Sequence, residues 1–206
     1  MSRHTALTLY DRCGTGLSPG PEADFSLEAS TAELATVLEH TARERDGAPA
    51  ALLAVSQAGP IALALALALA AERPELVSRL VLFGTYADAA STFPPTVREA
   101  MPRLLRSHWG LIARTLAELY RPGCSAHAVR HLGRVLQDSA GGQEAVGYLG
   151  AGYTFDVTRL LPKVRAPALV LHYRGDRVIP FRGGRDLAAA LPRARFLPLA
   201  DRSSTS

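Results

Sequence analysis

Residues 52–62 decide the fold and read LLAVSQAGPIA. A short apolar run ends in Ser56, small residues surround the serine, and a charge-free segment rich in alanine and leucine follows. Pro60 suits the first turn of a new helix, where the missing N–H group removes no helical hydrogen bond. We therefore expect a buried strand over residues 50–55, a sharp turn that exposes the Ser56 hydroxyl, and a helix over residues 60–72.

The same region also allows a membrane-spanning interpretation. Residues 48–71 contain no charged side chain, and a segment of that length can cross a bilayer. However, most of the segment is alanine, which is only weakly lipophilic, and Ser56, Gln57 and Gly59 interrupt its middle. Pro60 would in addition break one long helix. The strand, turn and helix are therefore favoured over a transmembrane segment.

The composition describes a globular chain with no sign of a nucleic-acid partner. Of 206 residues, 48% are hydrophobic and 20% are charged, which is enough for one domain with a sizeable core. The formal net charge is +4, but Lys163 is the only lysine, and the arginines are scattered rather than gathered into a basic stripe with aromatic residues. Nucleic-acid binding is therefore disfavoured. No cofactor is implied, and the oligomeric state stays open.

The cysteines and the N-terminus favour a reducing, cytoplasmic location. Cys13 and Cys124 belong to no Cys-x-x-Cys motif and to no metal-ligand spacing with histidine, so no zinc site is expected. Two isolated thiols fit a reducing compartment, although the sequence leaves one disulfide open. Residues 1–4 lead into a short mixed segment without the apolar core of a signal peptide.

Strand-like and helix-like patterns alternate on both sides of the turn at Ser56. Between residues 95 and 150 this alternation gives way to three successive amphipathic helical stretches. Buried strands that alternate with helices indicate a parallel sheet covered on both faces, with the helical block as an insertion. The expected strands are 5–10, 50–55, 79–83, 167–172 and 195–199, and the expected helices are 27–45, 60–72, about 96–120, 125–138 and 142–150, and 182–190.

Four segments, in order along the chain, resemble the α/β-hydrolases. Residues 10–18, YDRCGTGLS, resemble the Tyr-Asp-x-Arg-Gly-x-Gly-x-Ser loop of that family. Residues 56–62, SQAGPIA, resemble its nucleophile elbow, whose usual pattern is Gly-x-Ser-x-Gly. Residues 72–82, ERPELVSRLVL, resemble the helix-to-strand passage after the elbow, and residues 169–180, LVLHYRGDRVIP, resemble the strand and loop that carry the acid. The likeness extends to bacterial hydrolases fused to, or encoded beside, LuxR-type regulators and adenylate cyclases.

This resemblance implies an architecture and a substrate class. The fold would be α/β, an incomplete α/β-hydrolase fold with a mostly parallel sheet flanked by helices. Residues 1–94 and 151–206 would form the core, and residues 95–150 a helical cap over the site. The substrate would be an ester, thioester or amide of a small, mostly apolar molecule. The implied pocket wall consists of Leu104, Leu105, Trp109 and Leu116.

The resemblance also implies catalytic roles. In the family a serine attacks a carbonyl carbon, a histidine takes the serine proton, and an aspartate orients the histidine. By matching motifs, Ser56 would be the nucleophile and Asp176 the acid, while the backbone N–H of Gln57 would donate to the oxyanion. After the last strand the family has its histidine, but Ser204 stands about there in this chain. Serine accepts no proton near neutral pH, so we expect impaired catalysis.

The chain departs from the family pattern in other places. Alanine replaces both glycines beside the serine, at Ala54 and Ala58, and Cys13 replaces the arginine of the glycine loop. The three strands and the helix that precede this loop in the family have no counterpart, so the chain resembles a hydrolase truncated at both ends. Either residues 5–10 pair directly with residues 50–55, or a gap leaves strand edges exposed.

None of the six histidines stands in the expected place. His172, four residues before Asp176, is the best placed, and we interpret it as a packing residue. His127 and His131 lie one helical turn apart and could bind a metal, but no motif completes such a site. Two hypotheses therefore remain. The protein is a serine hydrolase, or it is a non-catalytic remnant of that fold that binds a ligand or takes part in signalling.

Overall fold

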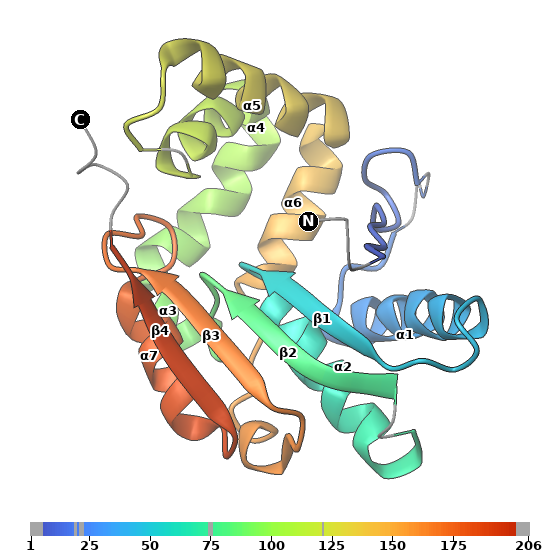
Figure 1. Ribbon diagram of the computed structural model, residues 1–206. Helices are drawn as coiled ribbons and strands as arrows, with labels where there is room; N and C mark the ends of the chain where they lie inside the picture. The colour runs from blue at the N-terminus through green and yellow to red at the C-terminus, as the bar shows by residue number, and fades with distance from the viewer. Residues whose placement is uncertain (1–5, 19, 21–22, 74–75, 121, 201–206) are drawn as a thin grey trace.

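The computed structural model describes residues 6–18, 20, 23–73, 76–120 and 122–200. Its centre is a sheet of four parallel strands whose spatial order, β1-β2-β3-β4, follows the order of the chain (Figure 1). The strands are β1 (Ala50–Val55), β2 (Val77–Phe83), β3 (Ala168–Tyr173) and β4 (Ala194–Leu199).

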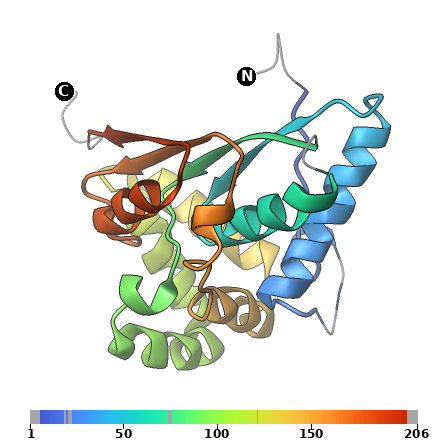
Figure 2. The same cartoon turned by 90° about the horizontal axis from the view of Figure 1, so that it is seen from below.

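Three helices cover one face of this sheet. They are α1 (Leu27–Arg43), α2 (Ala58–Glu72) and α7 (Phe181–Ala190). Helix α2 packs on β1 and β2, α7 packs on β3 and β4, and α1 packs against α2. The core between these layers contains fully buried Leu63, Leu82 and Val170. Figure 2 shows the three helices on the same side of the sheet.

No described helix covers the other face of the sheet. Its side chains are apolar but partly exposed, with Leu53 54% exposed, Val55 48% and Leu197 41%. All-parallel sheets normally have both faces covered. The expectation of helices on both faces is therefore wrong for the described part of the chain, because residues 6–26 form no helix that could pack there.

The helical block lies at the carboxyl ends of the strands (Figure 1). It contains α4 (Pro95–Tyr120), α5 (Ala126–Ser139) and α6 (Gly142–Gly152), preceded by the short helix α3 (Ala89–Thr92) and followed by the 3₁₀ turn η2 (Leu161–Lys163). Helix α4 packs against both α5 and α6. Non-helical angles at His108, φ −141° and ψ 41°, divide α4 into two segments.

Most of the expected elements are present, but the strand expected over residues 5–10 is not found among residues 6–10. Residues 6–10 form no strand, so among the described residues β1 pairs only with β2 and has an open edge. Residues 48–71 are not one helix, because strand β1 and helix α2 meet at Ser56. None of the helices among the described residues combines the length and the apolar character needed to cross a membrane. No disulfide joins Cys13 to Cys124.

Candidate active site

Ser56 occupies a strained turn between β1 and α2. Its φ is +57°, in the left-handed region that non-glycine residues seldom adopt. Three hydrogen bonds hold this conformation. The Ser56 N–H donates to the Phe83 carbonyl at 3.1 Å, and the Ser56 carbonyl accepts from the Gly59 N–H at 3.1 Å and from the Thr85 hydroxyl at 2.5 Å. A strand therefore turns abruptly into a helix with the serine at the corner, as the sequence predicts.

Small residues are needed around this corner because the packing is tight. A β-carbon added at Gly59 would overlap the Thr85 hydroxyl, so this position has no room for a side chain. Ala54 is buried in β1, and Ala58 is partly buried against the core. Alanine thus fits at both positions where the family pattern has glycine. In this chain the position that has no room for a β-carbon is Gly59.

Gln57 joins the Ser56 turn to the helical block. Its side chain is buried, and its Nε2 donates to the Tyr148 carbonyl of α6 at 3.1 Å. Its backbone N–H belongs to the turn that immediately precedes α2, where helix amides point outward without intrahelical acceptors. The role of that N–H as an oxyanion donor stays a prediction.

Asp176 lies at the same edge of the sheet as Ser56. Its Oδ1 accepts hydrogen bonds from the Val178 and Ile179 N–H groups, both at 2.9 Å, and 20% of its side chain is exposed. Its Oδ2 faces Gly84, the residue after β2, at 3.2 Å from where a β-carbon would stand. The Ser56 N–H donates to the carbonyl of Phe83, the last residue of β2, so Ser56 and Asp176 lie on either side of the end of β2.

The histidines supply no evident base within the described part of the chain. His172 is fully buried, and its Nε2 lies 2.9 Å from the Ile179 carbonyl and 3.5 Å from Asp176 Oδ2. His127 and His131 lie on α5, and the described residues contain no group of three or more His, Cys, Asp or Glu side chains able to hold a metal. Ser204 lies outside the described residues.

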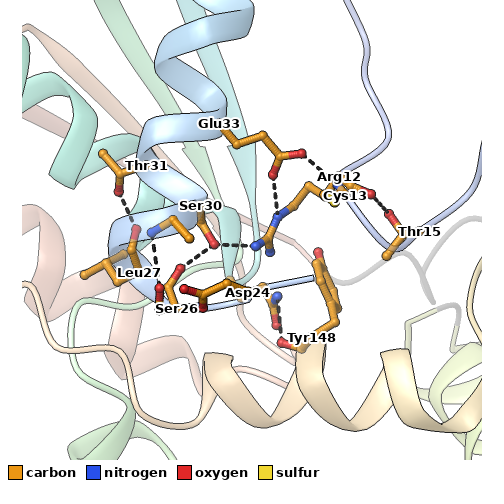
Figure 3. A network of polar contacts seen from close by, with 12 residues as sticks. Arg12, Cys13, Thr15, Asp24, Ser26, Leu27, Ser30, Thr31, Glu33 and Tyr148 are labelled. Carbon is orange, nitrogen blue, oxygen red and sulfur yellow. Dashed lines mark hydrogen bonds and ion pairs between the residues drawn. The ribbon is translucent and has the colours of Figure 1, made fainter. Parts of the chain in front are cut away.

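An arginine of the glycine loop, Arg12, is partly buried, although the sequence pattern suggested loss of the arginine at Cys13. The Arg12 guanidinium lies 5.6 Å from the ring centre of Phe25 and 5.0 Å from that of Tyr148, and it donates to the Ser30 hydroxyl (Figure 3). Arg12 therefore fills a partly buried position next to α6, one residue earlier than the family pattern. A shift of one residue cannot be recognised from the motif alone.

Four tyrosines near the site were not singled out from the sequence. The Tyr86 hydroxyl donates to the Gly152 carbonyl, and burial raises its pKa, with smaller contributions from Tyr153 and Tyr148. Desolvation of the Tyr120 hydroxyl raises its pKa to about 12, with smaller contributions from Tyr148, Tyr153 and the Asp176 carboxylate, although 39% of the residue is exposed. These residues come from three separate parts of the chain, namely the loop after β2, helix α4 and the C-terminal part of α6, so no local motif could identify them.

The residues expected to line a pocket lie in the helical block. Leu105 and Leu116 are buried in its apolar interior, where they pack with α6. The Trp109 indole N–H donates to the Ala140 carbonyl at 2.7 Å. Leu104, in contrast, is 40% exposed. Their contact with a substrate stays a prediction.

Comparisons with known proteins identify the family of this chain. Residues 2–197 match the Hydrolase_4 family, described as serine aminopeptidase, S33. The chain is 27% identical over 216 aligned residues to the protein named "Putative carbamate hydrolase RutD" of Pseudomonas savastanoi pv. phaseolicola, and the match covers 97% of this chain and 76% of the relative.

Solved structures share the fold at low sequence identity. A bromoperoxidase from Bacillus anthracis superimposes with a TM-score of 0.80 at 14% identity, covering 92% of this chain and 71% of the bromoperoxidase. An esterase from Exiguobacterium antarcticum gives 0.77 at 18% identity, covering 90% of this chain and 69% of the esterase. The parallel sheet, the turn at Ser56 and the family match together place this chain in the Hydrolase_4 family (serine aminopeptidase, S33) of the α/β-hydrolase superfamily.

Proposed function

We propose that this protein carries the nucleophile and the acid of a serine hydrolase for a small, mostly apolar molecule. The substrate would be an ester, a thioester, an amide or a carbamate. The conformation of Ser56 carries the proposal, because its φ of +57° has a steric cost that presentation of a nucleophile would explain. In this proposal residues 1–94 and 151–206 form the core, and residues 95–150 form a cap that supplies the pocket wall.

The proposal gives each of three groups a role. The Ser56 oxygen attacks the substrate carbonyl carbon while its proton passes to a base, and the Gln57 N–H donates to the oxygen that becomes negative. The acyl bond to the alcohol, thiol or amine then breaks, this group leaves with the proton from the base, and water releases the acyl group from Ser56. Asp176 Oδ2 is free of the two loop amides that occupy Oδ1, so it can accept from a base that lies above Gly84. The placement of Ser56 and Asp176 on either side of the end of β2 supports these roles.

We infer that hydrolysis by this chain is impaired, because none of the hydrogen bonds among the described residues joins the Ser56 hydroxyl to a histidine. Loss of the base lowers the rate of serine hydrolases by several orders of magnitude. Free imidazole in solution should therefore act in place of the missing side chain, between the Ser56 hydroxyl and the Asp176 carboxylate.

The test is labelling by a serine-directed fluorophosphonate probe, with and without added imidazole. We expect slow labelling at Ser56 that imidazole accelerates at least tenfold. Ser56→Ala should remove the labelling, whereas Ser91→Ala, on the short helix α3, should leave it unchanged. Hydrolysis of p-nitrophenyl acetate should show the same imidazole dependence above the Ser56→Ala background.

The missing base favours one alternative, a non-catalytic protein that binds a small ligand in the same fold. In that case Ser56 would resist the probe even at high imidazole concentration. Labelling equal in the wild type and in Ser56→Ala would contradict the enzymatic proposal and leave this alternative.

A further inference from the structure

We propose that His172 is a positioning residue that holds the Asp176 carboxylate in place through Ile179. The catalytic meaning of this contact rests on the proposed function, in which Asp176 is the acid. The contact itself is a property of the fold and can be tested without any catalytic activity.

Ile179 connects the two side chains through its backbone. Its carbonyl lies 2.9 Å from His172 Nε2, and its N–H donates to Asp176 Oδ1, also at 2.9 Å. The neighbouring Val178 N–H donates to the same carboxylate oxygen at 2.9 Å. Displacement of the imidazole would therefore leave the Ile179 carbonyl without its donor and let the backbone of Ile179 move. The Val178 and Ile179 N–H groups, which orient the carboxylate, would move with it.

The hydrogen-bond partners define the tautomer of His172. A carbonyl oxygen can only accept, so Nε2 must carry the hydrogen that faces Ile179. Nδ1 is buried and has no hydrogen-bond partner among the described residues, which suits an unprotonated nitrogen. Asp176 Oδ2 lies 3.5 Å from Nε2, beyond a good hydrogen bond, so this oxygen remains available on its Gly84 side.

The surroundings of His172 leave its ring one position. The residue is fully buried, and its ring meets the ring of Phe181 edge to face at 5.9 Å between centres. On α7, a β-carbon added at Gly184 would overlap His172 Nδ1. A β-carbon at the adjacent Gly183 would meet only ordinary contacts at 3.6 Å. Helix α7 therefore has one glycine, Gly184, at which the imidazole leaves no room for a β-carbon, and a neighbouring glycine, Gly183, at which a β-carbon fits.

The test compares four variants by amide hydrogen exchange and nitrogen NMR. His172→Phe removes the donor, and His172→Gln restores an N–H donor at a similar reach. In His172→Phe we expect the Val178 and Ile179 amides to exchange about tenfold faster relative to the Leu82 amide in β2, and in His172→Gln less than threefold faster. Gly184→Ala should reproduce the effect of His172→Phe, whereas Gly183→Ala should not.

Nitrogen NMR of His172 supplies an independent readout. We expect hydrogen on Nε2, which faces the Ile179 carbonyl. Equal changes in the phenylalanine and glutamine variants would reduce His172 to a packing residue and overturn the proposal. Absence of hydrogen on Nε2, or a Gly184→Ala variant that matches Gly183→Ala, would also overturn it. If Ser56 fails to react with the probe, these measurements still decide the role of His172.

Discussion

The turn at Ser56 and the loop at Asp176 position their side chains by different physical means. At the Ser56 turn, a strained backbone conformation presents the hydroxyl, and close packing of Gly59 on Thr85 keeps the strain in place. At the Asp176 loop, two backbone amides hold one carboxylate oxygen, without a positive φ at Asp176. Substitutions at the turn should therefore act through steric strain, and those at the loop through lost hydrogen bonds.

The largest effect is expected for Gly59→Ala. The new methyl group would overlap the Thr85 hydroxyl and displace its hydrogen bond to the Ser56 carbonyl. Overpacking of this kind destabilises a fold by about 3 kcal/mol. Chemical denaturation measures the change in the free energy of unfolding, and Ala58→Gly is the matched control, with a cost of about 1 kcal/mol from the flexible backbone. Equal costs for the two variants would show that the turn is not sterically closed.

A smaller loss is expected for Asp176→Ala, about 2 kcal/mol, because the Val178 and Ile179 amides lose a charged acceptor. Asp176→Asn keeps a side-chain oxygen and should recover about half of that loss. The free energy of unfolding is again the measurement. If the two variants are equally stable, the amides do not depend on the carboxylate, and the contrast with the Ser56 turn fails.

A gain is expected at the Ser56 turn. Glycine adopts a positive φ without steric cost, so Ser56→Gly should stabilise the fold by about 1 kcal/mol while removing the reactive hydroxyl. Ser56→Ala removes the same hydroxyl but keeps a β-carbon, and it should give no such gain. The difference between these two variants measures the strain directly, and no difference would mean that the turn carries none.

The sequence predicted the Ser56 turn better than the surroundings of Asp176. The bounds of β1 are those expected from the apolar run, and α2 begins at Ala58, two residues before the expected start. These features are local, because the small residues and Pro60 determine the conformation of the turn in which they lie. The contacts of His172 and Arg12 depend instead on elements distant in sequence, so the motif gave the place of Asp176 but not what holds it.

Residues 5–10 show the same limit in another form. Their apolar pattern predicts a strand, but a strand needs a neighbour, and in the structure residues 6–10 do not pair with the open edge of β1. The apolar pattern therefore identified β1 to β4, which pair with one another in the sheet. It failed for residues 6–10, whose pairing partner the sequence left open.

The smallest expected effect concerns alkaline pH and the Tyr120 hydroxyl near Asp176. Desolvation, with smaller contributions from Tyr148, Tyr153 and Asp176, raises its pKa to about 12, above the ordinary value of 10.0. Between these two values the unfolded chain loses the Tyr120 proton while the folded chain keeps it, so the stability contribution present below pH 10 is lost as pH rises towards 12.

Tyr120→Phe should reduce the slope of unfolding free energy against pH in that range. Asp176→Asn should reduce it less, because the carboxylate is only a minor contributor to the raised pKa. An unchanged slope in Tyr120→Phe would show that the hydroxyl is as well hydrated in the folded chain as in the unfolded one, and that the Asp176 loop has no desolvated neighbour on α4.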